Sequence, residues 1–121
     1  MTKSQTKVLD GLWSKLVKLK AKNECERCRR TDTLNSHHIF SRSSRSTRWD
    51  ERNGCCLCAG HHVLNNCSAH KAPIEFVEFL KEKRGEAWYQ QIRMIAGTPQ
   101  KVDYNLTRLY LEQEIKNQSN L

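Results

Sequence analysis

The clearest periodic pattern of apolar residues lies near the amino end, in residues 4–20. Apolar side chains recur there every three to four positions and lysines occupy positions between them; the apolar set is Val8, Leu9, Leu12, Trp13, Leu16 and Leu19. This spacing is typical of one face of an α-helix. The sequence therefore predicts an amphipathic helix within residues 1–22 that packs its apolar face on the rest of the domain.

The carboxyl-terminal part of the chain predicts three more helices. Pro73 suits the first turn of a helix because it has no amide hydrogen to leave unpaired, and apolar residues follow at helical spacing up to a stop at Arg84-Gly85. A short helix is expected over residues 86–96, before Gly97-Thr98-Pro99 breaks the chain. The last helix is expected over residues 104–116, with the apolar members Leu106, Leu109, Tyr110 and Ile115.

The middle of the chain has no such pattern. Residues 23–62 are irregular, polar and rich in Cys, His, Arg and Ser, which suits short strands and loops organised by a metal ion rather than by a large core. A chain of 121 residues suits one compact domain. We expect a single α+β domain over residues 1–121, in which a metal-stapled core of residues 23–72 is flanked by the amino-terminal helix and by helices within residues 73–121.

The overall charge favours a polyanionic partner. Lys and Arg number 21 against 13 Asp and Glu, so the net charge is +8, and the isoelectric point is near 9.4. Nucleic acid is the simplest partner of this kind. No run of 18 apolar residues is present and the first residues lack the pattern of a signal peptide, so we expect a cytoplasmic protein without membrane contact.

Potential metal ligands are concentrated in one segment. All six cysteines lie between Cys25 and Cys67, and all five histidines lie between His37 and His70. A reducing compartment disfavours disulfides, so metal binding or redox chemistry remains. A redox CxxC is the lesser alternative because no βαβ pattern surrounds the cysteines. We therefore favour metal binding.

Two matched spacings predict a structural zinc site. A pair of thiolates three positions apart can close on one zinc through a tight turn, and a second pair with imidazole in its last place would complete a tetrahedral Cys3His site. The predicted ligands are Cys25, Cys28, Cys58 and His61. The Cys67-Ser-Ala-His70 segment has the same spacing and is an alternative second half. Cys55 and Cys56 are expected to be small buried residues.

The segment from Cys25 to Pro73 resembles the HNH nucleases, whose ββα-metal motif runs from a His-His or Asp-His pair, through an Asn, to a CxxCH element that opens a helix. His37 and His38 match the His-His pair, and Asn53 matches the Asn. In that family a Cys, a second zinc ligand and a further His follow the Asn at fixed offsets, which here hold Cys58, His61 and His62. The flanking TRWDERNG and PIEFVEFLKEKRGEAWYQQI segments are similar to phage-associated HNH proteins and, more distantly, to the NinG/Rap recombination nucleases. The departure is His61, where the family usually has Cys, and it leaves open which of His61 and His62 faces which ion.

This resemblance implies roles for the matching residues. His37 and His62 would bind the catalytic metal, and His38 would be the general base that deprotonates the attacking water. Asn53 would fix the loop that carries His38 through side-chain hydrogen bonds. The implied cofactors are a structural Zn²⁺ and a catalytic divalent ion, Mg²⁺ or Mn²⁺ first, with Ni²⁺ or Zn²⁺ as further candidates.

The third ligand of the catalytic metal is a choice between Asn66 and His70. Asn66 stands four residues after His62, so a helix that begins near His61 would place both on one face, and the family has His or Asn at this offset. His70 is the better ligand for a transition metal, but a continuous helix of eight residues would carry it roughly 12 Å from His62 along the axis. We therefore expect Asn66 and keep His70 as the alternative.

Three arginines in a Ser- and Thr-rich segment suggest contacts with phosphate. Arg42, Arg45 and Arg48 recur at every third position and would position DNA rather than read its sequence. The resemblance implies a DNA endonuclease that leaves 5′-phosphate and 3′-hydroxyl ends, with phage packaging or recombination proteins as candidate partners and no indication of its oligomeric state. The alternatives are a non-catalytic, zinc-dependent nucleic-acid-binding module and a basic scaffold protein.

Overall fold

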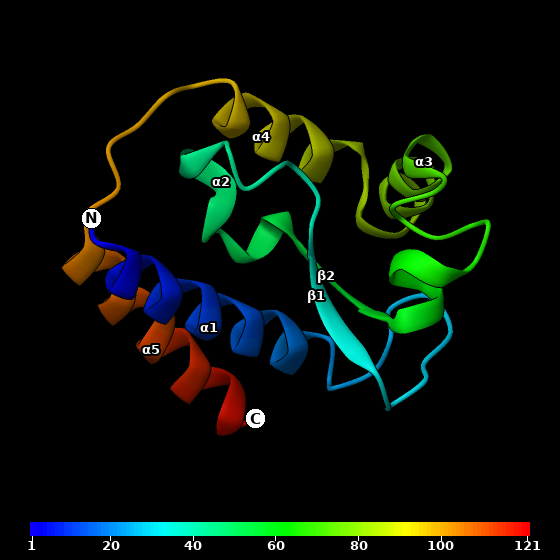
Figure 1. The fold of residues 1–121 in the computed structure, drawn as a ribbon, viewed down its shortest axis with the longest axis horizontal. Helices are drawn as coiled ribbons and strands as arrows, with labels where there is room; N and C mark the ends of the chain where they lie inside the picture. Colours follow the sequence, from blue (N-terminus) through cyan, green and yellow to red (C-terminus); the bar gives the residue numbers. More distant parts are fainter.

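The computed structural model describes residues 1–121 (Figure 1). The first element is helix α1, Lys3–Lys20. It begins with a capping box, in which the Gln5 amide donates to Thr2 Oγ1 at 3.1 Å and the Thr2 amide donates to Gln5 Oε1 at 2.9 Å. The buried residues of α1 lie on one face, which confirms the amphipathic helix predicted there; they are Leu9, Trp13, Leu16 and Val17.

A two-stranded antiparallel sheet follows α1. Strand β1, Leu34–His38, pairs with β2, Gly54–Cys58, so that His37 lies opposite Cys55 and His38 lies opposite Gly54. The connection between the strands contains the short helix α2, Arg45–Arg48, and a single 3₁₀ turn, η1, Glu51–Asn53. Directly after β2 comes η2, Gly60–Leu64, a turn of π-helix.

Three helices complete the chain. They are α3, Pro73–Arg84, α4, Glu86–Ala96, and α5, Tyr104–Ser119. Gly85 separates α3 from α4 with a φ of 94°, a left-handed conformation that glycine adopts without strain. All three predicted helices are confirmed, and α5 runs three residues past its predicted end. The fold is therefore α+β, as expected.

The two faces of the sheet contribute to two separate cores, because neighbouring residues of a strand point to opposite sides. Cys56 belongs to a core with α1, Trp49 and Leu111, whereas Cys55 belongs to a core with Phe76 and Leu80 of α3. Both cysteines are fully buried, which confirms the prediction for this pair. The same alternation sends His37 and His38 to opposite faces of β1.

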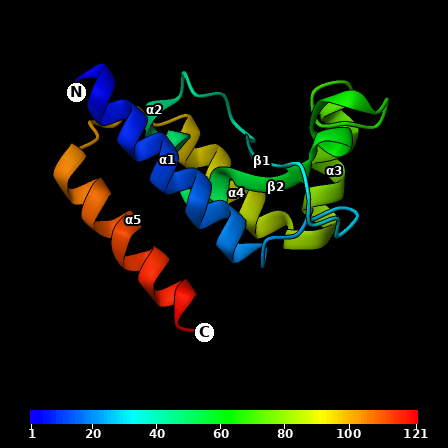
Figure 2. The ribbon, with the colours of Figure 1, turned by 60° about the horizontal axis from the view of Figure 1, so that its bottom comes forward.

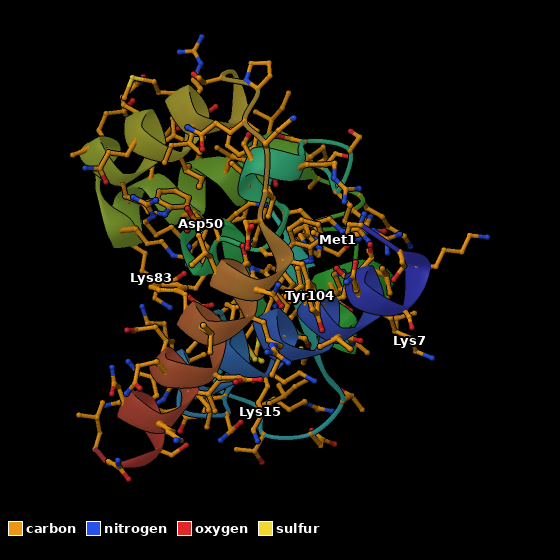
Figure 3. All side chains as sticks on the ribbon, turned by 90° about the vertical axis from the view of Figure 1, so that its left-hand side faces the viewer. Met1, Lys7, Lys15, Asp50, Lys83 and Tyr104 are labelled. Atoms are coloured by element: carbon orange, nitrogen blue, oxygen red, sulfur yellow. The ribbon has the colours of Figure 1, made fainter.

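Helix α5 runs alongside α1 in the same direction, at the edge of the molecule (Figure 2). Tyr104 marks its beginning in Figure 3. Only Leu111 of α5 is fully buried, while Leu106, Leu109 and Tyr110 remain about half to two-thirds exposed. The apolar members named from the sequence are thus mostly outside the core, because α5 packs on a single neighbouring helix. No helix of the protein is long and apolar enough to cross a membrane.

Candidate metal centres

The four predicted zinc ligands lie together at one end of the sheet. Cys25 and Cys28 come from the turn after α1, Cys58 ends β2, and His61 lies in η2; their ligand atoms are all within 4.8 Å of one another. Cys28 Sγ is 3.7 Å from Cys58 Sγ, and Cys58 Sγ is 3.4 Å from His61 Nδ1. Ligands around a tetrahedral zinc are separated by roughly 3.5 to 3.8 Å, given the usual Zn–S and Zn–N bond lengths. The donor set and its spacing fit a structural zinc ion.

The backbone around Cys25 favours its thiolate form. Burial raises the pKa of the Cys25 thiol, but hydrogen bonds from backbone amides, including that of Cys58, outweigh burial and lower the pKa to about 6. A thiolate is the form that binds zinc. The turn is also fastened to the sheet, since the Glu26 amide donates to the Cys56 carbonyl at 2.8 Å.

A second group of potential ligands consists of three histidines from three separate segments. His37 lies in β1, His62 in η2 and His70 in the loop before α3, and one nitrogen of each lies within 4.8 Å of the others. His62 Nε2 and His70 Nε2 are 3.1 Å apart. Two imidazole ligands of one transition-metal ion are separated by roughly 3.0 to 3.4 Å, which is close to this distance. These three residues can hold one divalent metal ion.

The environment of two of these imidazoles, His37 and His62, keeps them neutral. Burial, followed by the neighbouring His62 and His70, lowers the pKa of His37 to about 3. Burial and then His70 also lower the pKa of His62. Neutral imidazole is the form that binds a metal, so His37 and His62 have free lone pairs at neutral pH.

The expectation that a helix continues from His61 through Asn66 is wrong. The π-helical turn η2 ends at Leu64, and Asn65 has an extended conformation. The chain then folds back, so that the Ala69 amide donates to the His61 carbonyl at 2.8 Å and the His70 amide donates to the His62 carbonyl at 3.2 Å. This return places the His70 ring beside His62, whereas Asn66 is exposed. The reason for choosing Asn66 as the third ligand is therefore lost, and the alternative, His70, lies in the cluster.

The alternative second half of the zinc site, Cys67 with His70, does not lie beside Cys25 and Cys28. His70 belongs to the group with His37 and His62, and Cys67 belongs to neither group. The uncertainty between the neighbouring residues His61 and His62 is resolved in the same way, because His61 lies with the cysteines and His62 lies with the other histidines. The two groups thus adjoin along η2.

The ring of His38 lies on the other face of β1 and is held in two ways. His38 Nε2 is 2.9 Å from the carbonyl oxygen of Arg48, and the ring stacks on the indole of Trp13 with centroids 3.8 Å apart and planes 10° from parallel. A carbonyl oxygen can only accept a hydrogen bond, so Nε2 carries the hydrogen and Nδ1 is unprotonated in the neutral ring. Burial lowers the pKa of His38, although the hydrogen bond to the Arg48 carbonyl and the charge of Asp10 act to raise it. His38 is therefore neutral at neutral pH and can accept a proton at Nδ1.

Asn53, the last residue of η1 immediately before β2, is fully buried, and every polar group of its side chain is paired. Its Oδ1 accepts from the Phe40 amide at 2.7 Å, and its Nδ2 donates to the carbonyls of Phe40 and Thr47, each at 3.1 Å. These bonds fix the segment that follows His38. The resemblance implied such side-chain hydrogen bonds from Asn53 to the loop that carries His38.

The three arginines of this segment are in different environments. Arg42 is exposed and lines the cleft that contains His37 and His38. Arg45 is exposed and its guanidinium lies over the Trp49 ring, 5.1 Å from the centroid. Arg48 differs, because Asp10 of α1 accepts two hydrogen bonds from its guanidinium at 2.8 and 3.1 Å. The Nε and Nη2 donors of Arg48 therefore face a carboxylate of the protein, unlike those of the two exposed arginines, and its contact with phosphate stays a prediction.

His37, His38, His62 and His70 all line one open cleft of about 630 Å³, which also receives Asp10, Trp13 and Ser14 from α1. A hollow of similar size, about 670 Å³, lies between α5 and Trp49, but no cluster of potential metal ligands lines it. The histidine cleft combines a group that can bind a metal ion with a neutral imidazole that can accept a proton.

Sequence patterns assign no role in this cleft to two of its residues. They predict Trp13 only as part of the buried face of α1, and they do not single out Asp10. Asp10 is the only acidic residue in α1 and its side chain is about one-third exposed. A lone carboxylate beside the apolar face of a lysine-rich helix was the available signal.

Comparisons with models of protein families, with curated proteins and with solved structures found no match to this chain.

Proposed function

We propose that the protein is a metal-dependent endonuclease that hydrolyses phosphodiester bonds in DNA. The observation that carries this proposal is the content of the histidine cleft: three imidazoles that can share one metal ion, and a fourth, His38, whose Nδ1 is unprotonated. Hydrolysis of a phosphodiester needs a group that accepts a proton from water and a group that stabilises negative charge on the phosphate.

The chain's own residues would divide this work. His38 accepts the proton of the attacking water at Nδ1, while its Nε2–H stays on the Arg48 carbonyl. Arg42, exposed at the cleft, binds and orients a phosphate. A divalent ion bound by His37, His62 and His70 would supply stabilisation of the negative charge on the phosphate and on the leaving oxygen.

The donor set also revises the expected metal. The resemblance implied Mg²⁺ or Mn²⁺ first, with Ni²⁺ or Zn²⁺ as further candidates. Three imidazoles instead suit transition metals such as Mn²⁺, Co²⁺, Ni²⁺ or Zn²⁺ better than Mg²⁺, which prefers oxygen ligands. We therefore expect activity with transition ions to exceed activity with Mg²⁺.

The arrangement supports membership of the HNH nucleases. The elements follow the order of that motif. A pair of strands is joined by a loop, with the His37-His38 pair on the first strand and Asn53 immediately before the second. A helical turn that carries His62 comes next. The short η2 turn and the return loop to His70 are this chain's departures from a motif that ends in a longer helix.

DNA is the proposed substrate because the cationic residues exceed the acidic ones by eight. Lysines line the outside of α1, whose inner residues reach the cleft. Lys7 and Lys15 lie on the side of α1 that faces away from α4 (Figure 3). Such a surface binds phosphates without reading the sequence of bases.

Nicking of supercoiled plasmid tests this function. The wild type should nick DNA only when a divalent transition metal is added, and His38→Ala should lose on the order of 10²–10⁴-fold in rate while its DNA affinity and zinc content stay unchanged. Ser41→Ala, at another residue of the same cleft, is the matched control and should cleave like the wild type. Tight DNA binding without any metal-dependent cleavage would instead favour the non-catalytic zinc module.

A further inference from the structure

Helix α1 carries none of the candidate metal ligands, yet it reaches the cleft through Asp10, Trp13 and Ser14, and the first two lie about one turn apart. Asp10 and Trp13 both line the cleft next to His38. Residues three positions apart on a helix lie on the same face. The two side chains therefore act on one region of the segment between β1 and β2.

That region is the run Arg48–Asp50, and α1 binds each of its three residues. Asp10 accepts hydrogen bonds from the Arg48 guanidinium at 2.8 and 3.1 Å and from the Trp49 indole at 2.8 Å. Trp13 donates its indole N–H to the Asp50 carbonyl at 2.8 Å. The run begins at the last residue of a helix of only four residues, which has little stability of its own. These bonds to α1, together with the bond from Asn53 to the neighbouring Thr47 carbonyl, hold the Arg48 carbonyl in place.

The position of that carbonyl determines the orientation of His38. Two contacts fix the ring, the bond from Nε2 to the Arg48 carbonyl and the stack on Trp13, and both depend on α1. Without the first bond the ring is free to carry its hydrogen on either nitrogen; without the stack its plane is free to rotate.

We propose that Asp10 and Trp13 are positioning residues that hold His38 in the tautomer and orientation needed to accept a proton from water. This inference rests on the proposed nuclease activity for its kinetic part. Neither residue touches the reacting atoms: Asp10 acts through Arg48, and Trp13 acts through the face of the imidazole. Asp10 is the better residue to test because Trp13 is also part of the core and its loss would unfold α1 from the sheet.

The kinetic test compares Asp10→Asn with Asp32→Asn, which makes the same change of charge at an exposed aspartate paired only with Arg30. Asp10→Asn should lower kcat for plasmid nicking by about tenfold or more, with KM for DNA and the half-saturating metal concentration unchanged. Asp32→Asn should behave like the wild type. Unchanged kcat in Asp10→Asn, or a change in KM alone, would overturn the inference.

A double variant separates positioning from a general effect on the fold. If Asp10 acts through His38, Asp10→Asn should not slow the residual cleavage by His38→Ala any further, because there is no imidazole left to orient. An equal loss in both backgrounds would show that Asp10 acts elsewhere, and would contradict the proposal.

A measurement on the zinc-loaded protein keeps the inference testable even if the protein cleaves no DNA. Nitrogen-15 NMR of the imidazoles should show the His38 hydrogen on Nε2 in the wild type and in Asp32→Asn, with slow exchange. In Asp10→Asn the hydrogen should exchange faster or populate both nitrogens. If the wild type shows this fixed tautomer but no nicking, the proposed function fails and the positioning stands; if Asp10→Asn leaves the His38 signal unchanged, the positioning fails.

Discussion

The side chain of Asn53 fixes the long connection between β1 and β2 at two places, Phe40 and Thr47. Its three hydrogen bonds are made with backbone groups, and the residue is completely buried. A buried amide or carbonyl that loses its partner costs more than the bond itself contributes, because no water replaces the lost bond. The conformation of this connection therefore depends strongly on one residue.

Asn53→Ala should destabilise the protein by about 2 to 4 kcal/mol, since it leaves an amide and two carbonyls without their partner. The free energy of unfolding in urea measures the change. Asn35→Ala is the matched control, because Asn35 is exposed and its side chain makes one bond, to the Thr33 carbonyl. The control should stay within about 0.5 kcal/mol of the wild type. Equal stability of the two variants would show that the connection is held by other contacts.

At the level of single residues, the spacing of cysteines and histidines predicted a group of potential metal ligands, but the sequence did not predict hydrogen-bond partners that are far apart in the chain. The CxxC and CxxH spacings identified the four residues of the zinc cluster because such pairs close on one ion through a local turn. The pairing of Arg48 with Asp10 could not be predicted because the two residues are 38 positions apart and nothing local indicates their contact. Asn66 was preferred because helical periodicity was extended past Leu64, where the chain in fact turns back.

At the scale of the elements, α1 and β2 approach each other closely at Gly54. A Cβ atom at Gly54 would lie 2.3 Å from Val17 Cγ2 and 2.9 Å from Trp13 Cζ2. Only glycine allows the strand to lie this close to the helix. Because Trp13 stacks on His38, the same approach also fixes the distance between α1 and the histidine cleft.

Gly54→Ala should destabilise the protein by about 1 to 3 kcal/mol through overpacking. The cost should fall by about 1 kcal/mol when Val17→Ala is already present, because that change removes the nearer obstacle. Thermal and urea unfolding of the single and double variants measure this coupling. Gly11→Ala is the control: nothing lies within 4 Å of a Cβ there, so it should stabilise the exposed helix by about 0.5 to 1 kcal/mol. Additive effects of Gly54→Ala and Val17→Ala would contradict the close packing.

The helices were predictable and the connections were not, for a physical reason. Helices α1, α3 and α4 carry apolar periodicity with local start and stop signals such as Pro73 and Gly85, so each can be read from its own residues. Strands β1 and β2 carry histidines and cysteines instead of alternating apolar residues, and their ends depend on Asn53 and on the metal ligands. Such elements are defined by tertiary contacts.

At the scale of the whole molecule, the Cys3His group that can hold zinc joins the turn after α1 to the end of β2. It closes a segment that contains β1 and the whole connection to β2. Glu26 supports it, since its carboxylate accepts from the Cys56 amide at 2.8 Å and from Arg84 of α3 at 2.9 Å. Because the sheet has only two strands, the ion would supply stability that a larger core supplies in other proteins.

The purified protein should keep about one zinc per chain after dialysis against a weak chelator, because four ligands with thiolate charge bind more tightly than three imidazoles. Cys58→Ser should lose this zinc and unfold or aggregate, whereas Cys67→Ser, outside both clusters, should keep it. Elemental analysis and thermal unfolding monitored by circular dichroism measure both properties. A Cys58→Ser protein with wild-type zinc content and melting temperature would rule out the stapling role.

The central claim is that His37, His62 and His70 form the metal site of a nuclease, and the dependence of plasmid nicking on Mn²⁺ concentration tests it most directly. His70→Ala should raise the Mn²⁺ concentration for half-maximal nicking at least about tenfold, because one of three ligands is lost. Asn66→Ala, four residues away and exposed, should follow the wild-type curve. A larger shift for Asn66→Ala than for His70→Ala, or wild-type protein that nicks no DNA at any Mn²⁺ concentration, would contradict the account.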